Sequence, residues 1–144
     1  MLNQMNTFQG STIARTSLQQ FISRLIKKSY KTALTNQSLV MNKVGEDLMI
    51  DTCNLKLIAL ISELLETVIA NSKRGEIYIT AERYSDMIIL SLQERNNYNG
   101  YALAYTIGTM EPEAITLGGH IAINGPQKKV TTISFSFPNQ PIAA

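Results

Sequence analysis

The chain has a single cysteine, Cys53, among its 144 residues and no long uninterrupted apolar run. One cysteine cannot form an internal disulfide, so a disulfide-stapled scaffold is excluded and a reducing compartment is expected. Polar and charged side chains interrupt the most apolar stretch, residues 55–70, which excludes a membrane span there. The N-terminus also lacks the basic segment, the apolar segment and the cleavage-like site of an export signal. We therefore expect a cytoplasmic protein with no membrane partner.

Charged residues make up only 17% of the chain and hydrophobic residues 44%, the balance of an ordinary globular domain. A chain of this length accommodates one domain. The basic residues are concentrated in the first third, and four of them fall on one face of a predicted helix: Arg24, Lys27, Lys28 and Lys31. Aromatic residues do not interleave with this basic stripe, so a solvated face is favoured and no nucleic-acid partner is expected.

Hydrophobic periodicity predicts an alternation of helices and strands. The first helix follows Ser17 and runs to about Thr35, and the second begins after a cap at Asp51 or Thr52. This order suits an α/β sandwich, in which helices cover one face of a mixed sheet. We expect a flexible leader at 1–11, one domain at 12–138 and a tail at 139–144. Further helices are predicted at 101–109 and from Pro112 to 117, and strands at 12–16, 38–43, 47–51, 76–83, 87–94, 120–124 and 129–137.

Two stretches carry a resemblance to a known family. One is the second helix with its following strand, residues 57–79, and the other runs from Gly118-Gly119-His120-Ile121 to Phe135-Ser136-Phe137-Pro138. With the order of elements, they make residues 12–138 similar to the ATP-binding catalytic domain of sensor histidine kinases. That domain belongs to the GHKL, or Bergerat-fold, ATPases, together with gyrase-type topoisomerases, Hsp-type chaperones and the mismatch-repair ATPase MutL. The resemblance implies a histidine-kinase-like ATPase fold.

The resemblance also implies where a nucleotide would bind, and each of those positions is altered. In the family, a helix carries an acid or amide and, four residues later, a magnesium-holding Asn; Glu63 and Thr67 match this pair. A Thr hydroxyl is a poorer ligand than an amide oxygen for octahedral Mg²⁺. Glu94 stands where an Asp accepts the adenine amino group, and Asn96 and Tyr98 replace the glycines of the first glycine box.

The second glycine box and the mobile lid are altered as well. The box maps onto residues 104–107, so that Thr106 is the residue left to meet a phosphate, and neither family glycine is present there. Only residues 99–103 are available for the lid, which is too short to close over a triphosphate. We interpret the chain as a degenerate member whose nucleotide site has been abandoned.

The resulting hypothesis is a pseudoenzyme that acts as an interaction or regulatory module in two-component signal transduction, without cofactor. Its partner would be a receiver domain or a kinase hairpin, contacted by the basic stripe and by Tyr98, Tyr101 and Tyr105. A homodimer is left open. One alternative is a divergent ATP-binding kinase domain with ATP and magnesium, using Glu63, Thr67, Glu94 and Thr106. The other is a fragment of a phosphotransferase.

Three further residues have a weaker claim to chemistry. His120 is the only histidine but starts a predicted strand, so an exposed strand residue is favoured over a phosphoacceptor. Cys53 opens the second helix without a nearby base in the sequence, which argues against a nucleophile. Glu63 and Glu66 lie one helical turn apart, a spacing more typical of a solvated edge than of a catalytic pair. No spacing of His, Cys, Asp and Glu predicts a metal site.

Overall fold

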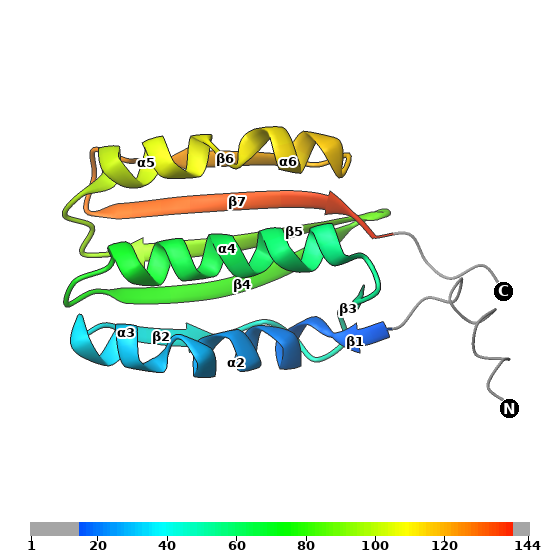
Figure 1. Ribbon diagram of the computed structural model, residues 1–144, viewed down its shortest axis with the longest axis horizontal. Coiled ribbons are helices and arrows are strands. Elements are labelled where there is room, and N and C mark those ends of the chain that lie inside the picture. Colours follow the sequence, from blue (N-terminus) through cyan, green and yellow to red (C-terminus); the bar gives the residue numbers. More distant parts are fainter. Residues whose placement is uncertain (1–14, 140–144) are drawn as a thin grey trace, which may run out of the picture.

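The computed structural model describes residues 15–139, which form a five-stranded sheet with helices over one face (Figure 1). The predicted leader and the tail from residue 140 lie outside the described residues, as does most of the strand predicted at 12–16. The described elements are β1 (Arg15–Ser17), α2 (Leu18–Lys28), α3 (Tyr30–Thr35), β2 (Leu39–Asn42), β3 (Met49–Asp51), α4 (Leu55–Asn71), β4 (Glu76–Tyr84), β5 (Met87–Arg95), α5 (Gly100–Gly108), α6 (Glu111–Thr116), β6 (His120–Asn124) and β7 (Val130–Pro138).

The five strands lie in the order β2-β4-β5-β7-β6, and β1 pairs with β3 in a separate antiparallel ribbon. β2 runs parallel to β4, because the chain crosses over through α4 between them. The other neighbouring strands of the sheet are antiparallel. This mixed sheet with helices on one face is the α/β sandwich that the sequence predicts, so the fold class is confirmed.

Alternation along the central strands determines which face is covered. In β5, Ile88, Leu90 and Leu92 are buried, whereas the residues between them are only partly buried. The register of β5 with β7 places Leu90 opposite Phe135, which continues the same apolar face. These side chains meet the buried residues of α4 in one core. A one-residue slip of β5 would expose all of them, so this register is strongly specified.

The helix starts confirm one predicted cap and correct another. The Ser17 side chain accepts a hydrogen bond from the backbone N–H of Gln20 and caps α2, as predicted. The prediction that Asp51 or Thr52 caps the second helix is wrong, because Asn54 accepts a hydrogen bond from the N–H of Leu57. Asp51 instead accepts from the N–H of Cys53 and stabilises the turn before α4. Cys53 therefore precedes the helix and is exposed.

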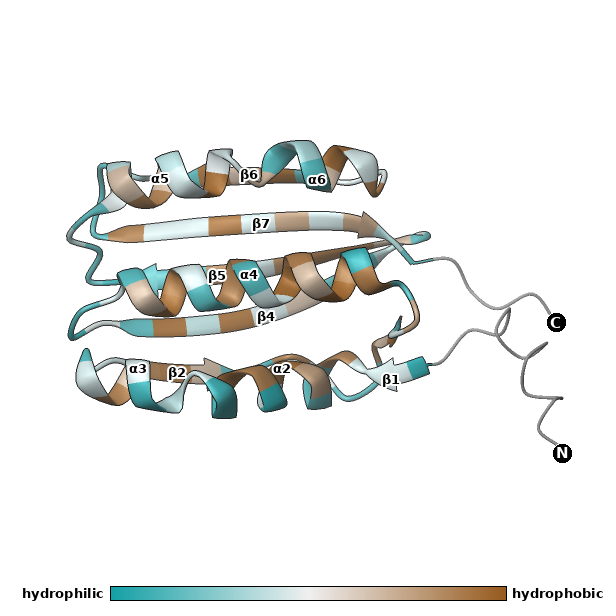
Figure 2. Ribbon diagram, in the orientation of Figure 1, coloured by the Kyte–Doolittle hydropathy of each residue, from teal (hydrophilic) through white to brown (hydrophobic). Residues whose placement is uncertain are grey.

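The first predicted helix is two helices. α2 ends at Lys28 and α3 begins at Tyr30, with Ser29 serving as the last cap of one and the first cap of the other. The backbone of Ser29 has φ −96° and ψ 9°, outside the helical range, so the chain changes direction there. Figure 2 shows that both helices have apolar and polar sectors, as expected for helices that cover a sheet.

The second face of the sheet carries no helix in the described part of the chain, and short polar side chains lie in the middle of it. Ser91 on β5 lies opposite Ser134 on β7, and Gln93 lies opposite Thr132. Such residues tolerate a solvated face. Within residues 15–139, no helix combines the length and the apolar character needed to cross a membrane.

Candidate functional site

The sequence predicts that a nucleotide would bind between α4 and the loop at 95–100. Along the same side of α4 runs the groove between this helix and the pair α5–α6. Glu63 projects from α4 toward this groove and lines a cavity of about 110 Å³, together with Leu60 and with Glu113 of α6. Thr67, one turn further along α4, is half-buried, and Glu66 is exposed. Small-molecule sites enclose roughly 300–1,000 Å³. The space beside Glu63 is therefore too small for a nucleoside triphosphate.

Glu94 occupies the helix-facing side of β5 near the end of the strand, in phase with Leu92 and Leu90. Its exposed fraction is 0%, and neither carboxylate oxygen has a hydrogen-bond partner. Burial raises the pKa of Glu94 above its ordinary value, and this effect exceeds the opposing influence of the nearby Ser72 and Asn71 side chains. The side-chain nitrogen of Asn71 is likewise buried without a partner. Glu94 is thus a buried ionisable group beside Asn71 and Ser72 at this end of the sheet.

Asn97 closes the sheet beyond Glu94, and sequence reasoning did not find it. Its side-chain amide donates to the carbonyl oxygens of Pro126 (3.2 Å) and Lys128 (3.1 Å) and to Oγ1 of Thr131 (2.7 Å), which share its two N–H groups. Thr131 is buried opposite Glu94 and donates to the carbonyl oxygen of Gly125 at 2.9 Å. We call Asn97, Thr131 and the 125–128 turn the amide clamp. The clamp fixes the loop after β5 against the β6–β7 hairpin.

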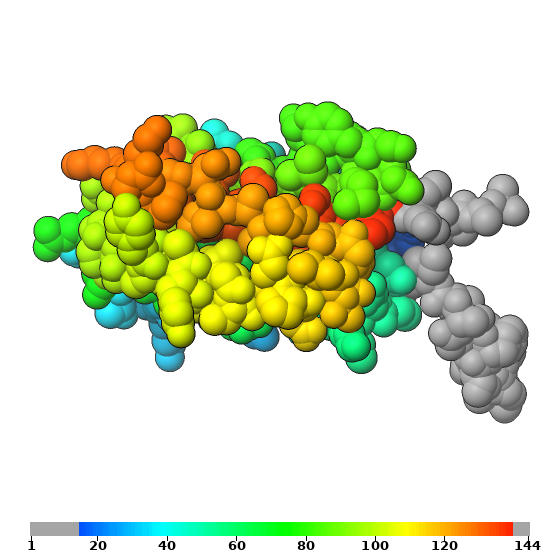
Figure 3. All heavy atoms as spheres, turned by 90° about the horizontal axis from the view of Figure 1, so that it is seen from above, coloured from blue at the N-terminus to red at the C-terminus, as the bar shows by residue number. Residues whose placement is uncertain are grey.

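The connection that would contain a lid is shorter than the sequence predicts. β5 extends to Arg95 and α5 begins at Gly100, so only residues 96–99 lie between them. A Cβ atom at Gly100 would overlap the carbonyl oxygen of Pro126, which shows how closely the helix start packs on the hairpin. Figure 3 shows the yellow atoms of α5 and α6 beside the orange atoms of the hairpin along this edge. The residues from 100 to 103, assigned to the lid remnant, are already helical.

The residues predicted to match the second glycine box lie inside a helix. Residues 104–107 lie inside α5, and Thr106 directs its hydroxyl to the carbonyl oxygen of Ala102. Backbone N–H groups inside a helix are already paired, so they cannot cradle a phosphate. The free amides are those at the start of α5, near Gly100. The Asn-Gly pair at 99–100 is the local signal that would have placed this start.

The residues expected to contact a partner fall into two separate groups. Tyr98, Tyr101 and Tyr105 are exposed around the start of α5 and along it. Arg24, Lys27, Lys28 and Lys31 are exposed on α2 and α3, and none has an ion-pair partner within residues 15–139. Figure 1 shows that α4 and its neighbouring strands lie between the two groups. A single small partner is therefore expected to contact one group or the other.

His120 and Cys53 lie away from both groups. Nδ1 of His120 is 2.7 Å from a carboxylate oxygen of Glu111, which joins the start of β6 to α6. Cys53 is exposed. Within the described part of the chain, no three side chains of His, Cys, Asp or Glu lie close enough together to hold a metal ion.

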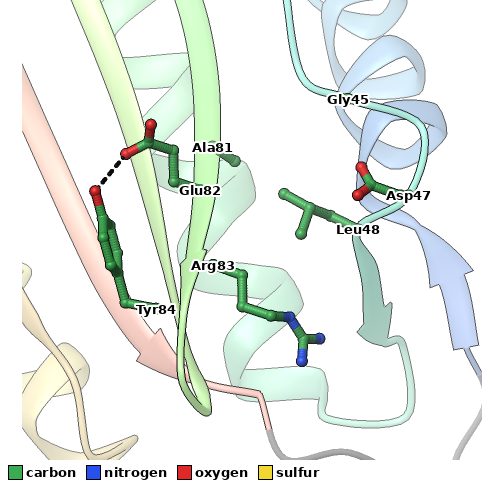
Figure 4. A pocket seen from close by; sticks show the side chains of 7 residues that line it. All are labelled: Gly45, Asp47, Leu48, Ala81, Glu82, Arg83 and Tyr84. Atoms are coloured by element: carbon green, nitrogen blue, oxygen red, sulfur yellow. Dashed lines mark hydrogen bonds between the residues drawn. The ribbon is translucent and has the colours of Figure 1, made fainter.

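A cavity of about 470 Å³ lies outside the nucleotide groove (Figure 4). It opens where β2 stops and β4 continues past Ile79, so the 45–48 loop faces the last residues of β4 across it. Figure 4 shows Arg83 and Glu82 on opposite sides of β4. The Tyr84 hydroxyl donates to Glu82 at 2.8 Å, and this bond, with the charge of Glu82, raises the pKa of Tyr84. The polar groups do not converge on one point in this cavity.

No protein-family profile matches the sequence, and no curated protein sequence matches it. Solved structures do match. The chain has the fold of the ATP-binding catalytic domain of histidine kinases, a GHKL-type ATPase fold. Identities of 9–15% among the structures described below show the fold alone.

Three of these structures illustrate the likeness. The nucleotide-free catalytic domain of the histidine kinase ThkA is 15% identical with a TM-score of 0.63, and the match covers 90% of this chain and 99% of that one. A histidine kinase from Burkholderia phymatum is 9% identical with a TM-score of 0.70, over 95% of this chain and 75% of that one. ThkA in complex with the response regulator TrrA is 14% identical with a TM-score of 0.63, over 95% of this chain and 46% of that one.

Proposed function

We propose that this chain is a histidine-kinase-like ATPase domain that no longer binds nucleotide and acts as a protein-interaction module in signalling. One observation carries the proposal: the connection between β5 and α5 is four residues long, 96–99, and is tied down by the amide clamp. A lid must be free to open and close over its ligand. The residues at this groove therefore do not fit a magnesium–nucleotide complex, and no catalytic step is derived for them.

Calorimetric titration with ATP and Mg²⁺ tests the proposal. We expect no binding heat and no shift in melting temperature at millimolar nucleotide, because a ligand that binds only the folded state must raise its stability. The catalytic domain of ThkA, titrated in parallel, is the reference for the same fold. Saturable binding to this chain would contradict the proposal.

A receiver domain is the partner that we propose. The support is the solved complex of ThkA with the response regulator TrrA, together with the unpaired basic residues on α2 and α3 of this chain. Binding to a panel of receiver domains should weaken when Arg24, Lys27, Lys28 and Lys31 are replaced by Ala, or when Tyr98, Tyr101 and Tyr105 are replaced. Binding that neither set of replacements changes would remove both groups from the interface.

A divergent ATP-binding domain is the second candidate, and the buried carboxylate of Glu94 favours it. An unpaired buried acceptor is costly, and a purine amino group would satisfy it. In that case Glu94 would hold the base, while Glu63, Thr67 and Thr106 would lie near the phosphates and magnesium. ATP binding that is lost in Glu94→Leu, which removes both acceptor oxygens, would support this candidate over the first. A phosphotransferase that contains this domain is a third candidate. It requires an additional helical hairpin, and mass spectrometry of the native protein would reveal the extra mass of that segment.

A further inference from the structure

An apolar groove runs between α3 and the edge strand β2, on the side of the molecule away from α5. It encloses about 330 Å³ and is lined by Ile26, Tyr30, Ala33, Leu34, Ser38, Leu39 and Val40. We call it the α3–β2 groove. Tyr30 and Leu34 are each 62% exposed and Leu39 is 60% exposed, although each is a large apolar side chain. Three such residues around one cavity form a patch rather than scattered exceptions, and exposed apolar patches rimmed by polar residues mark interaction sites.

The helix side of the groove, formed by α2 and α3, carries charge of one sign, whereas Glu76 lies opposite Leu39 on the strand side. Lys27 and Lys31 follow Ile26 and Tyr30 directly in the sequence, so they lie on the adjoining solvent-facing side of the same helices. Both are exposed and lack an ion-pair partner within residues 15–139. Neither α2 nor α3 contains an acidic residue. An apolar occupant that also carries acidic side chains would therefore match the groove and its rim.

We propose that the α3–β2 groove binds an amphipathic helix of a partner protein, with the apolar face of that helix between Tyr30, Leu34 and Leu39 and its acidic flank against Lys27 and Lys31. The inference rests on the proposed interaction function and specifies its partner. The patch is concave, with a helix on one side and a strand on the other, and a helix ridge fits such a groove. Only one of its lining residues is aromatic, so stacked bases have little to bind.

The test uses a synthetic probe. A fluorescein-labelled 18-residue helical peptide carries leucines at i, i+3, i+4 and i+7 and glutamates on both flanks, and binding is followed by fluorescence anisotropy. A second peptide has the same leucines with lysines in place of the glutamates. We expect saturable binding of the acidic peptide, at least tenfold weaker binding of the basic one, and weakening of the acidic peptide's binding as salt is raised. Equal binding of both peptides, or no binding of either, would overturn the proposal.

Two protein variants locate the probe. Lys27→Glu with Lys31→Glu should weaken the acidic peptide at least tenfold and improve binding of the basic peptide, because the rim changes sign. The matched control is Lys56→Glu with Lys129→Glu, which makes the same change of net charge at exposed positions away from the groove. Leu34→Ser should weaken both peptides without altering the melting temperature. If the control pair weakens binding as much as the rim pair, net charge alone is responsible and the groove is excluded.

Competition identifies the class of occupant. Single-stranded DNA and vesicles of phosphatidylcholine with phosphatidylserine are added to the bound acidic peptide. We expect neither to displace it; displacement that Leu34→Ser abolishes would assign the groove to nucleic acid or to a membrane instead. The ATP titration described above is read separately. If the chain binds both the acidic peptide and ATP, the proposed function is overturned and the groove proposal stands. If it binds neither the peptide nor ATP, the groove proposal is overturned, and the group of Tyr98, Tyr101 and Tyr105 is left as the interface.

Discussion

The Glu94 end of the sheet and the α3–β2 groove depart from the ordinary distribution of residues in opposite ways. At the first, an ionisable side chain is buried without a partner. At the second, large apolar side chains are exposed beside unpaired lysines. Only the first carries a substantial cost in folding free energy, because an unpaired buried carboxylate loses its hydration whereas an exposed leucine loses little. The comparison teaches that the fold keeps the buried Glu94 at a cost in folding free energy, whereas the exposed side chains of the α3–β2 groove cost the fold almost nothing.

We expect the largest effect from Gly100→Ala, which disrupts the packing of the start of α5 on the β6–β7 hairpin. The new Cβ would overlap the carbonyl oxygen of Pro126, so the start of α5 or the hairpin must move. We expect the free energy of unfolding to fall by about 3 kcal/mol, measured by urea denaturation. Gly108→Ala is the matched control, since a Cβ there has no neighbour within 4 Å. Equal effects at the two glycines would mean that α5 does not pack on the hairpin as described.

Asn97→Ala removes the amide clamp without adding volume. The side chain donates to three oxygen atoms, and its loss removes a donor from the half-buried carbonyl of Pro126, from the hydroxyl of Thr131 and from the exposed carbonyl of Lys128. We expect a loss of roughly 2 kcal/mol in unfolding free energy, together with faster hydrogen exchange of the amides at 96–100. Asn99→Ala is a suitable control, because its side chain does not cap α5. Unchanged exchange in Asn97→Ala would show that the loop is held by other contacts.

Glu94→Gln should stabilise the protein at neutral pH by on the order of 1 kcal/mol. The folded state raises the pKa of Glu94 above its ordinary 4.5, so the folded protein binds the proton more tightly than the unfolded chain does. The stability of the native protein is therefore full below about pH 4.5 and is lost as pH rises through the folded pKa. The free energy of unfolding of Glu94→Gln should therefore exceed that of the native protein increasingly as pH rises through this range. Denaturation curves from pH 4 to pH 8 measure it, and a constant difference would contradict the burial of a titrating group.

Leu34→Ser and Leu39→Thr should change the unfolding free energy by less than about 0.5 kcal/mol each. Both side chains are mostly exposed, so little apolar surface is returned to water. Thermal melting measures the effect, with Leu64→Ser on the buried face of α4 as the destabilised reference. A large loss from Leu34→Ser would show that the groove is part of the core.

The sequence predicts the sheet and the long helix because their signals are local. Alternation of Ile88, Leu90 and Leu92 and the helical spacing within α4 depend on residues a few positions apart, and both are confirmed. The amide clamp is different, because Asn97 and Thr131 are 34 residues apart in the chain and carry no local pattern that relates them. Glu94 matched a family position, and the alternation of β5 places it on the covered face, but only the structure shows that its carboxylate is fully buried. The α3–β2 groove was missed because a helix pattern shows amphipathicity without showing how far an apolar side chain is covered.

The side chain of Asn139 donates to the backbone carbonyl of Met49, and Met49 pairs with Ser17. The first and last described residues therefore leave the domain at the same end, opposite to the start of α5 (Figure 1). Any module joined to the domain at either side emerges there. A donor and an acceptor fluorophore attached at the two ends would stay close while the protein is folded and separate when it unfolds. The two labels would leave the tyrosine group and the α3–β2 groove uncovered.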